Sequence, residues 1–136
     1  MYSLRDFIRA MKKSNRPQLY GALLGVDKVT GELCGCALGQ AVLNTGLFDE
    51  EKIRQELLRE GNPYTLTVYN PDTQKTESKR FLCGTTSEAD SETRRALNFL
   101  SYQIGSEFKN AVIHANDRKR QPIFDIAAKL FEKWGN

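Results

Sequence analysis

Residues 31–43 read GELCGCALGQAVL, and the pattern of this stretch changes at its centre. Its first part is extended and follows the apolar run of residues 19–26 across a turn that contains Asp, Thr and Gly, which predicts a β-hairpin. From Cys36 onward the apolar side chains recur at helical spacing instead. We therefore expect a strand-to-helix junction at Gly35-Cys36 and a helix that ends at Gly46, a residue type that tolerates left-handed backbone geometry.

Patterns on either side of this junction predict the remaining elements. Apolar residues at helical spacing predict further helices, over residues 4–11, 48–57, 87–108 and from Pro122 onward. Alternating, β-rich residues predict a second hairpin over 64–69 and 76–83, and a short strand over 111–114. The expected fold is α+β, a single compact domain over residues 1–136, with about five helices packed on a small, mostly antiparallel sheet.

The composition is that of a folded, single-domain protein. The chain has 136 residues, of which 40% are hydrophobic and 27% charged, and one domain takes roughly 100–200 residues. No apolar run approaches the ~20 residues of a membrane helix, and the N-terminus lacks the apolar core of an export signal. Three cysteines, a small and odd number, fit a reducing compartment. We therefore expect a cytoplasmic protein with no membrane partner.

Cys36 is the first candidate for chemistry, because backbone amides at a helix N-terminus lower the pKa of a nearby thiol. A nucleophilic cysteine needs a base, and His114 is the only histidine in the chain. Asn116 follows two residues later, on the same face of the expected strand. Cys36, His114 and Asn116 are therefore a candidate nucleophile, base and orienting residue for a papain-like hydrolase or transferase. The alternative is that Cys36 is a small apolar residue packed at a tight junction.

The cysteines and the histidine also match a Cys₃His zinc site in number and type. The spacing argues against this site, because one residue separates Cys34 from Cys36 where zinc sites have two to four. Glycine patterns that bind nucleotides are absent from the sequence. We therefore predict neither a metal nor a cofactor.

The strongest candidate for recognition is the polar loop before the last helix, which reads Asn116-Asp117-Arg118-Lys119-Arg120. Cations just before a helix hold phosphate through their side chains together with free backbone amides. Positive charge is also concentrated at the two ends of the chain, since residues 1–20 carry a net charge of +4 and residues 109–136 carry +3. No nucleic-acid motif accompanies these charges, so a nucleic-acid partner rests on electrostatics alone.

The core of the quoted stretch, Cys36-Ala37-Leu38-Gly39-Gln40-Ala41, resembles the C-A-L-G-A-type motif of a family of small uncharacterised bacterial and phage proteins. In that family an Asn-Asp pair later opens a final amphipathic helix, and the corresponding pieces here are Asn116-Asp117 and residues 123–131. This chain departs from the pattern at Gln40, where a small residue is usual, and at His114-Ala115, where an aromatic residue is frequent. The resemblance implies no activity. It implies that Cys36, Gly39, Asn116 and Asp117 form a set, and tying the loop to the Cys36 junction is one structural role for it.

Together these features favour a small accessory or regulatory binding protein of bacterial or phage type. Its contact surface would be the basic loop, and its partner a phosphate-bearing ligand or an acidic protein. The alternative is the cysteine-dependent enzyme described above. A third interpretation is an obligate homo-oligomer whose apolar helix faces form the interface.

Overall fold

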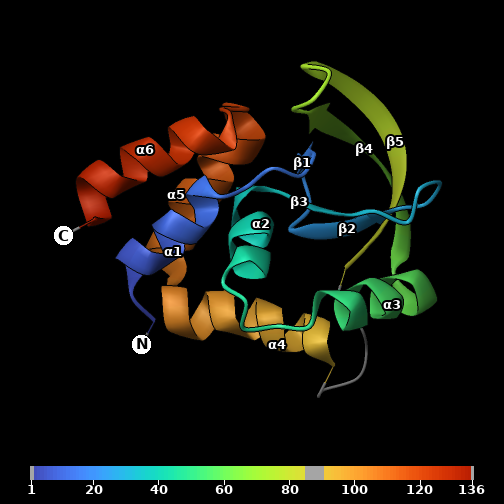
Figure 1. The fold of residues 1–136 in the computed structure, drawn as a ribbon, viewed down its shortest axis with the longest axis horizontal. Coiled ribbons are helices and arrows are strands. Elements are labelled where there is room, and N and C mark those ends of the chain that lie inside the picture. The colour runs from blue at the N-terminus through green and yellow to red at the C-terminus, as the bar shows by residue number, and fades with distance from the viewer. Residues whose placement is uncertain (1, 85–90, 136) are drawn as a thin grey trace.

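The computed structural model describes residues 2–84 and 91–135 and places its helices beside and below a small sheet (Figure 1). The helices are α1 (Leu4–Lys12), α2 (Ala37–Asn44), α3 (Glu50–Glu60), α4 (Glu92–Phe99), η1 (Leu100–Ile104), α5 (Ser106–Ile113), η2 (His114–Arg118) and α6 (Ile123–Trp134), of which η1 and η2 are π-helical turns. The strands are β1 (Gln18–Leu19), β2 (Leu24–Asp27), β3 (Leu33–Gly35), β4 (Asn62–Asn70) and β5 (Lys75–Cys83). The fold is compact and α+β, as the sequence predicts.

The five strands close into a barrel in the order β1-β3-β2-β5-β4. The β2–β3 and β4–β5 pairs are antiparallel, which confirms both predicted hairpins. β1 pairs with β4 in the antiparallel sense but with β3 in parallel. The expectation of a mostly antiparallel sheet is therefore wrong, and the sheet is mixed. The parallel pair arises because β1 lies beside β3 instead of β2, and a strand of two residues leaves no alternating pattern from which this pairing could be predicted.

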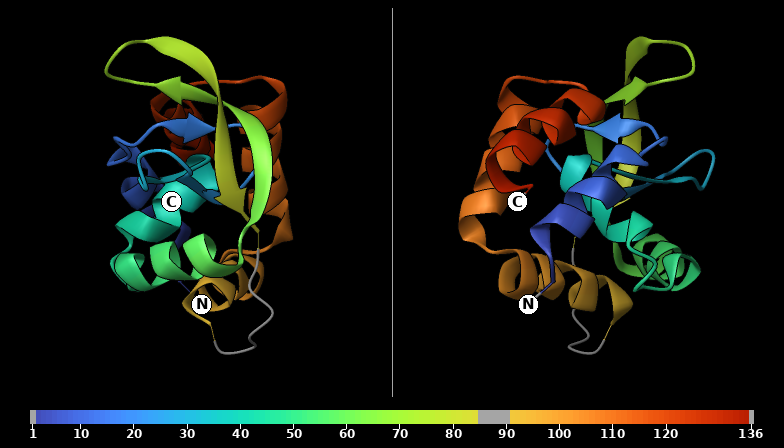
Figure 2. Two further views of the ribbon diagram at one scale, coloured as in Figure 1. Left: turned by 90° about the vertical axis from the view of Figure 1, so that its right-hand side faces the viewer. Right: turned by 60° about the vertical axis from the view of Figure 1, so that its left-hand side comes forward.

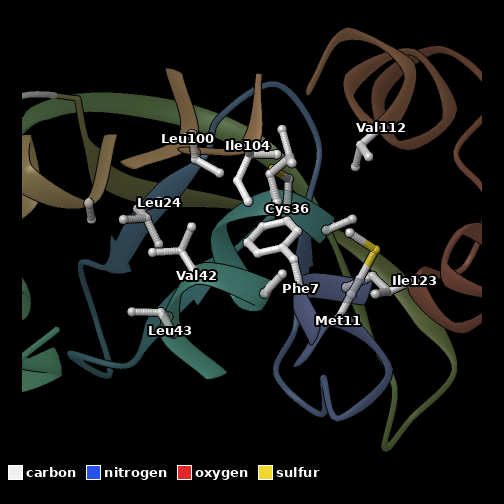
Figure 3. Close-up of a cluster of buried hydrophobic side chains, with 14 of the residues drawn as sticks. Phe7, Met11, Leu24, Cys36, Val42, Leu43, Leu100, Ile104, Val112 and Ile123 are labelled. Atoms are coloured by element: carbon white, nitrogen blue, oxygen red, sulfur yellow. The ribbon is translucent and has the colours of Figure 1, made fainter. Parts of the chain in front are cut away.

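α2 lies at the centre of the core, and seven of its eight residues are buried. It contacts α1, α5 and β3, so apolar side chains are needed on all its faces. Figure 3 shows Val42 and Leu43 of this helix among side chains from α1, β2 and η1. A second, smaller cluster fills the barrel and contains Leu19, Cys34, Val68, Phe81 and Cys83.

The helix predicted over residues 87–108 is divided in the structure. α4 begins after Ser91, whose Oγ accepts a hydrogen bond from the Arg94 amide at 3.1 Å, and residues 87–90 lie outside the described residues. Gly105, with a φ of +94°, separates η1 from α5. The strand predicted at 111–114 is wrong, because α5 runs to Ile113 and buries Phe108 and Val112, which lie one helical turn apart.

The two basic ends of the chain are neighbours, because α1 and α6 pack against each other (Figure 2). Lys12 Nζ lies 4.5 Å from the centre of the Phe131 ring, within the range of a cation–π contact. In the described part of the chain, no helix is both long enough and apolar enough to cross a membrane.

Candidate functional site

Asn116 is fully buried, and its side chain joins three separate parts of the chain. Its Oδ1 accepts hydrogen bonds from Gln18 Nε2 at 2.9 Å and from the Ala37 amide at 3.0 Å. Its Nδ2 donates to the Leu19 carbonyl at 2.9 Å and to Asp117 Oδ1 at 2.7 Å. All four hydrogen bonds that an asparagine side chain ordinarily makes are therefore formed inside the protein.

Asp117 and Gln18 extend this network. Asp117 Oδ1 also accepts a hydrogen bond from the Gly21 amide at 3.0 Å, so it holds the chain just beyond β1. Gln18 Nε2 donates a second hydrogen bond, at 2.9 Å, to the Gln121 carbonyl, just before α6. Asn116, Asp117 and the Gln121 carbonyl are thus all tied to β1 or to the chain just beyond it.

Gln40 completes the network from α2. Its Oε1 accepts from the Arg16 amide at 3.1 Å, and its Nε2 donates to the Arg16, Pro17 and Gly35 carbonyls at 3.0 to 3.1 Å. The side chain is fully buried, and these contacts tie α2 to the chain just before β1 and to the end of β3. We call Gln18, Gln40, Asn116 and Asp117 the polar clamp.

The four residues that the family resemblance groups together all contact residues 19–23. Asn116 and Asp117 bind the Leu19 carbonyl and the Gly21 amide, as described above. The Cys36 amide donates to the Leu23 carbonyl at 3.2 Å. At Gly39, an added Cβ would lie 1.8 Å from that same carbonyl oxygen, so only glycine allows α2 to approach residue 23 this closely. The set holds the segment that links β1 to β2.

The Cys36 thiol is buried at the start of α2, where Figure 3 shows it among apolar side chains. Burial raises its pKa to about 11, although the Leu38 and Gly39 amides act in the opposite direction. The expected lowering of the Cys36 pKa is therefore wrong, because loss of water outweighs the helix N-terminus. At neutral pH the thiol is protonated, which is the state of an inert, structural cysteine.

The residues of the catalytic alternative differ in their surroundings. His114 is exposed at the start of η2, and Asn116 is buried and already bonded to the Ala37 amide. Among the described residues, no hydrogen bond joins Cys36 to His114. Asn116 therefore reaches the Cys36 junction by accepting from the Ala37 backbone amide. The catalytic set of Cys36, His114 and Asn116 remains a prediction.

Cys34 and Cys83 are also buried and free. Burial raises the pKa of Cys34 to about 12 and that of Cys83 to about 11. Within residues 2–84 and 91–135, no three His, Cys, Asp or Glu side chains are grouped so that they could hold a metal ion.

The five residues of the predicted basic loop separate into two groups. Asn116 and Asp117 belong to the polar clamp, whereas Arg118, Lys119 and Arg120 are exposed. We call these three cations the basic turn. In the described part of the chain none of them forms an ion pair.

Arg120 has a defined position on this turn. Its guanidinium lies 4.9 Å from the centre of the Tyr20 ring, and its backbone adopts a positive φ of +48°. α6 begins three residues later, at Ile123, and no side chain caps its first amides. Three cations and the positive end of a 12-residue helix dipole therefore lie within a few residues of each other.

Sequence reasoning missed Gln18 and the internal role of Gln40. Gln40 did carry a signal, because it is the one polar residue in an otherwise apolar helical run. Gln18 carried none, since a glutamine after Pro17 is ordinary in a loop.

A comparison of the chain with family models, curated proteins and solved structures finds no match. The function is therefore argued from the site itself.

Proposed function

We propose that this chain is a binding protein that recognises a phosphate-bearing ligand with the basic turn. The observation that carries the proposal is the contrast within residues 116–120: the first two side chains are bonded internally, and the three cations that follow have no acidic partner among the described residues.

The position of the turn favours phosphate over an acidic protein. Phosphate accepts hydrogen bonds from guanidinium and ammonium groups and from the free amides of a helix N-terminus at the same time. Arg118 and Lys119 supply the first kind of donor, and the uncapped start of α6 supplies the second. Because Asn116 anchors the turn, little conformational entropy is lost when a ligand binds.

The experiment is a titration of the full chain with inorganic tripolyphosphate, measured by isothermal titration calorimetry. Arg118→Gln combined with Lys119→Gln should weaken binding roughly tenfold or more, a free-energy change of about 1.4 kcal/mol or above. The control is Lys28→Gln with Arg80→Gln, which removes the same charge from two other exposed positions and should leave affinity within about twofold.

An equal loss of tripolyphosphate affinity in both double variants would mean that only the net charge of the protein matters, and it would overturn the proposal. So would the absence of tripolyphosphate binding together with binding of a poly-glutamate peptide, which would instead support an acidic protein as partner.

A further inference from the structure

A cavity of about 290 Å³ lies at one end of the barrel, apart from the polar side chains of the clamp. Its walls come from the start of β2, the first half of β4, the end of β5 and the outer face of α4, and it includes the chain between β1 and β2. Ligand sites are frequent at the mouths of β-barrels.

The lining is apolar and uncharged. Leucines at positions 23, 66 and 97 form much of it, and no Asp, Glu, Lys, Arg or His is among the described lining residues. Thr93 belongs to the lining, but its hydroxyl proton is already donated to Glu56 Oε1 at 2.8 Å and is not available to a ligand. The remaining side-chain polar groups are the Cys83 thiol, protonated at neutral pH, and the Tyr64 hydroxyl.

The cavity is preformed. One wall is residues 21–24, which the polar clamp and Cys36 hold through the Gly21 amide and the Leu23 carbonyl. Behind Leu24 and Leu97 the core closes, because the adjoining crevice has no room for a water molecule. Tyr64, which is 52% exposed, belongs to the lining. The wall of residues 21–24 is thus fixed before any ligand arrives, which raises affinity.

From this volume, lining and fixed wall, we propose that the mouth of the barrel binds a small, uncharged, apolar molecule with a fused or paired ring system. The size follows from the volume, which is roughly twice that of an engineered cavity of about 150 Å³ that holds benzene. The charge follows from complementarity, since a charged group would lose its water here without gaining a partner. This proposal is independent of the phosphate site.

The test is a titration of the full chain with N-phenyl-1-naphthylamine, an uncharged dye whose fluorescence rises in apolar surroundings. We expect saturable binding of one dye per chain, displaced by naphthalene. Binding should be the same in low and high salt, because no charge takes part. The phosphate-site variant Arg118→Gln with Lys119→Gln should bind the dye like wild type, so the two proposals fail separately.

Leu97→Trp should weaken dye binding at least tenfold by filling the cavity, whereas Leu47→Trp, at a 51% exposed position outside the lining, should not. Ala22→Leu narrows the cavity from the wall of residues 21–24. It replaces Leu97→Trp as the test variant if circular dichroism shows that Leu97→Trp does not fold. Absence of saturable binding to wild type would overturn the proposal, and so would unchanged affinity in a folded cavity variant.

Discussion

Asn116 and Asp117 differ from Arg118, Lys119 and Arg120 in where their side chains make contacts. The first two side chains take part in five hydrogen bonds inside the protein, to β1, the residues just beyond it, the start of α2 and each other, while the three cations face solvent.

 Asn116 takes part in four of these five hydrogen bonds and Asp117 in two, because the two side chains share one of them. Neighbouring polar residues of one turn thus differ in role. The packing around the turn decides which side chains point into the protein and which point into solvent.

The largest effect is expected at Asn116. Asn116→Ala leaves the buried Ala37 amide and Leu19 carbonyl without their partner, and each unsatisfied buried group costs roughly 1–3 kcal/mol. We therefore expect a loss of about 4 kcal/mol in the free energy of unfolding, measured by urea denaturation. The control is Asn110→Ala on an exposed face of α5, which should change stability by less than about 0.5 kcal/mol. Similar small losses in both variants would show that the clamp does not stabilise the fold.

Gly39→Ala should have the next largest effect. The added Cβ would lie 1.8 Å from the Leu23 carbonyl oxygen, so α2 and residue 23 must move apart, at a cost of about 3 kcal/mol. At Gly46 a Cβ meets nothing within 4 Å and only the positive φ opposes it, so Gly46→Ala should cost about 1 kcal/mol. Thermal unfolding of both variants measures the difference, and equal losses would argue against a close approach at Gly39.

The dependence of stability on alkaline pH distinguishes a buried, protonated Cys36 thiol from an activated thiolate. Its pKa rises from 9.0 to about 11 on folding, so the folded state favours the neutral thiol. The resulting stabilisation is complete below pH 9 and is lost between pH 9 and pH 11, as the thiol ionises first in the unfolded chain. Relative to Cys36→Ala, wild type should lose about 2 kcal/mol over that interval. A wild-type chain that instead gains stability relative to Cys36→Ala as the pH rises from 6 to 9 would indicate a stabilised thiolate.

The smallest effect on stability is expected at the basic turn. Arg118 and Lys119 make no ion pair within the described residues, so Arg118→Gln with Lys119→Gln should change the free energy of unfolding by less than about 0.5 kcal/mol. Chemical denaturation of the variant used for the tripolyphosphate titration supplies this value. A loss above about 2 kcal/mol would mean that these cations, like Asn116, belong to the interior.

Much of the fold could be predicted from the sequence, because both hairpins and the helix after Cys36 rest on local patterns. Ser3 and Asp49, residue types that favour the N-cap position, accept hydrogen bonds from the Asp6 and Lys52 amides. The parallel β1–β3 pair could not be predicted, since it depends on a contact between two short, distant segments. The same holds for the site: the residues 116–120 are identifiable as polar, but only the packing of η2 against β1 decides which of them face inward.

The most direct test of the polar clamp is the amide hydrogen exchange of Ala37 and Gly21, measured by NMR in the folded wild-type protein. These two amides donate to Asn116 and Asp117, and neither bond is part of a helix or strand ladder. We expect the Ala37 amide to exchange as slowly as the core amides of α2, through global unfolding, and the Gly21 amide to be protected as well. Exchange of the Ala37 amide at the rate of an open loop would contradict the account.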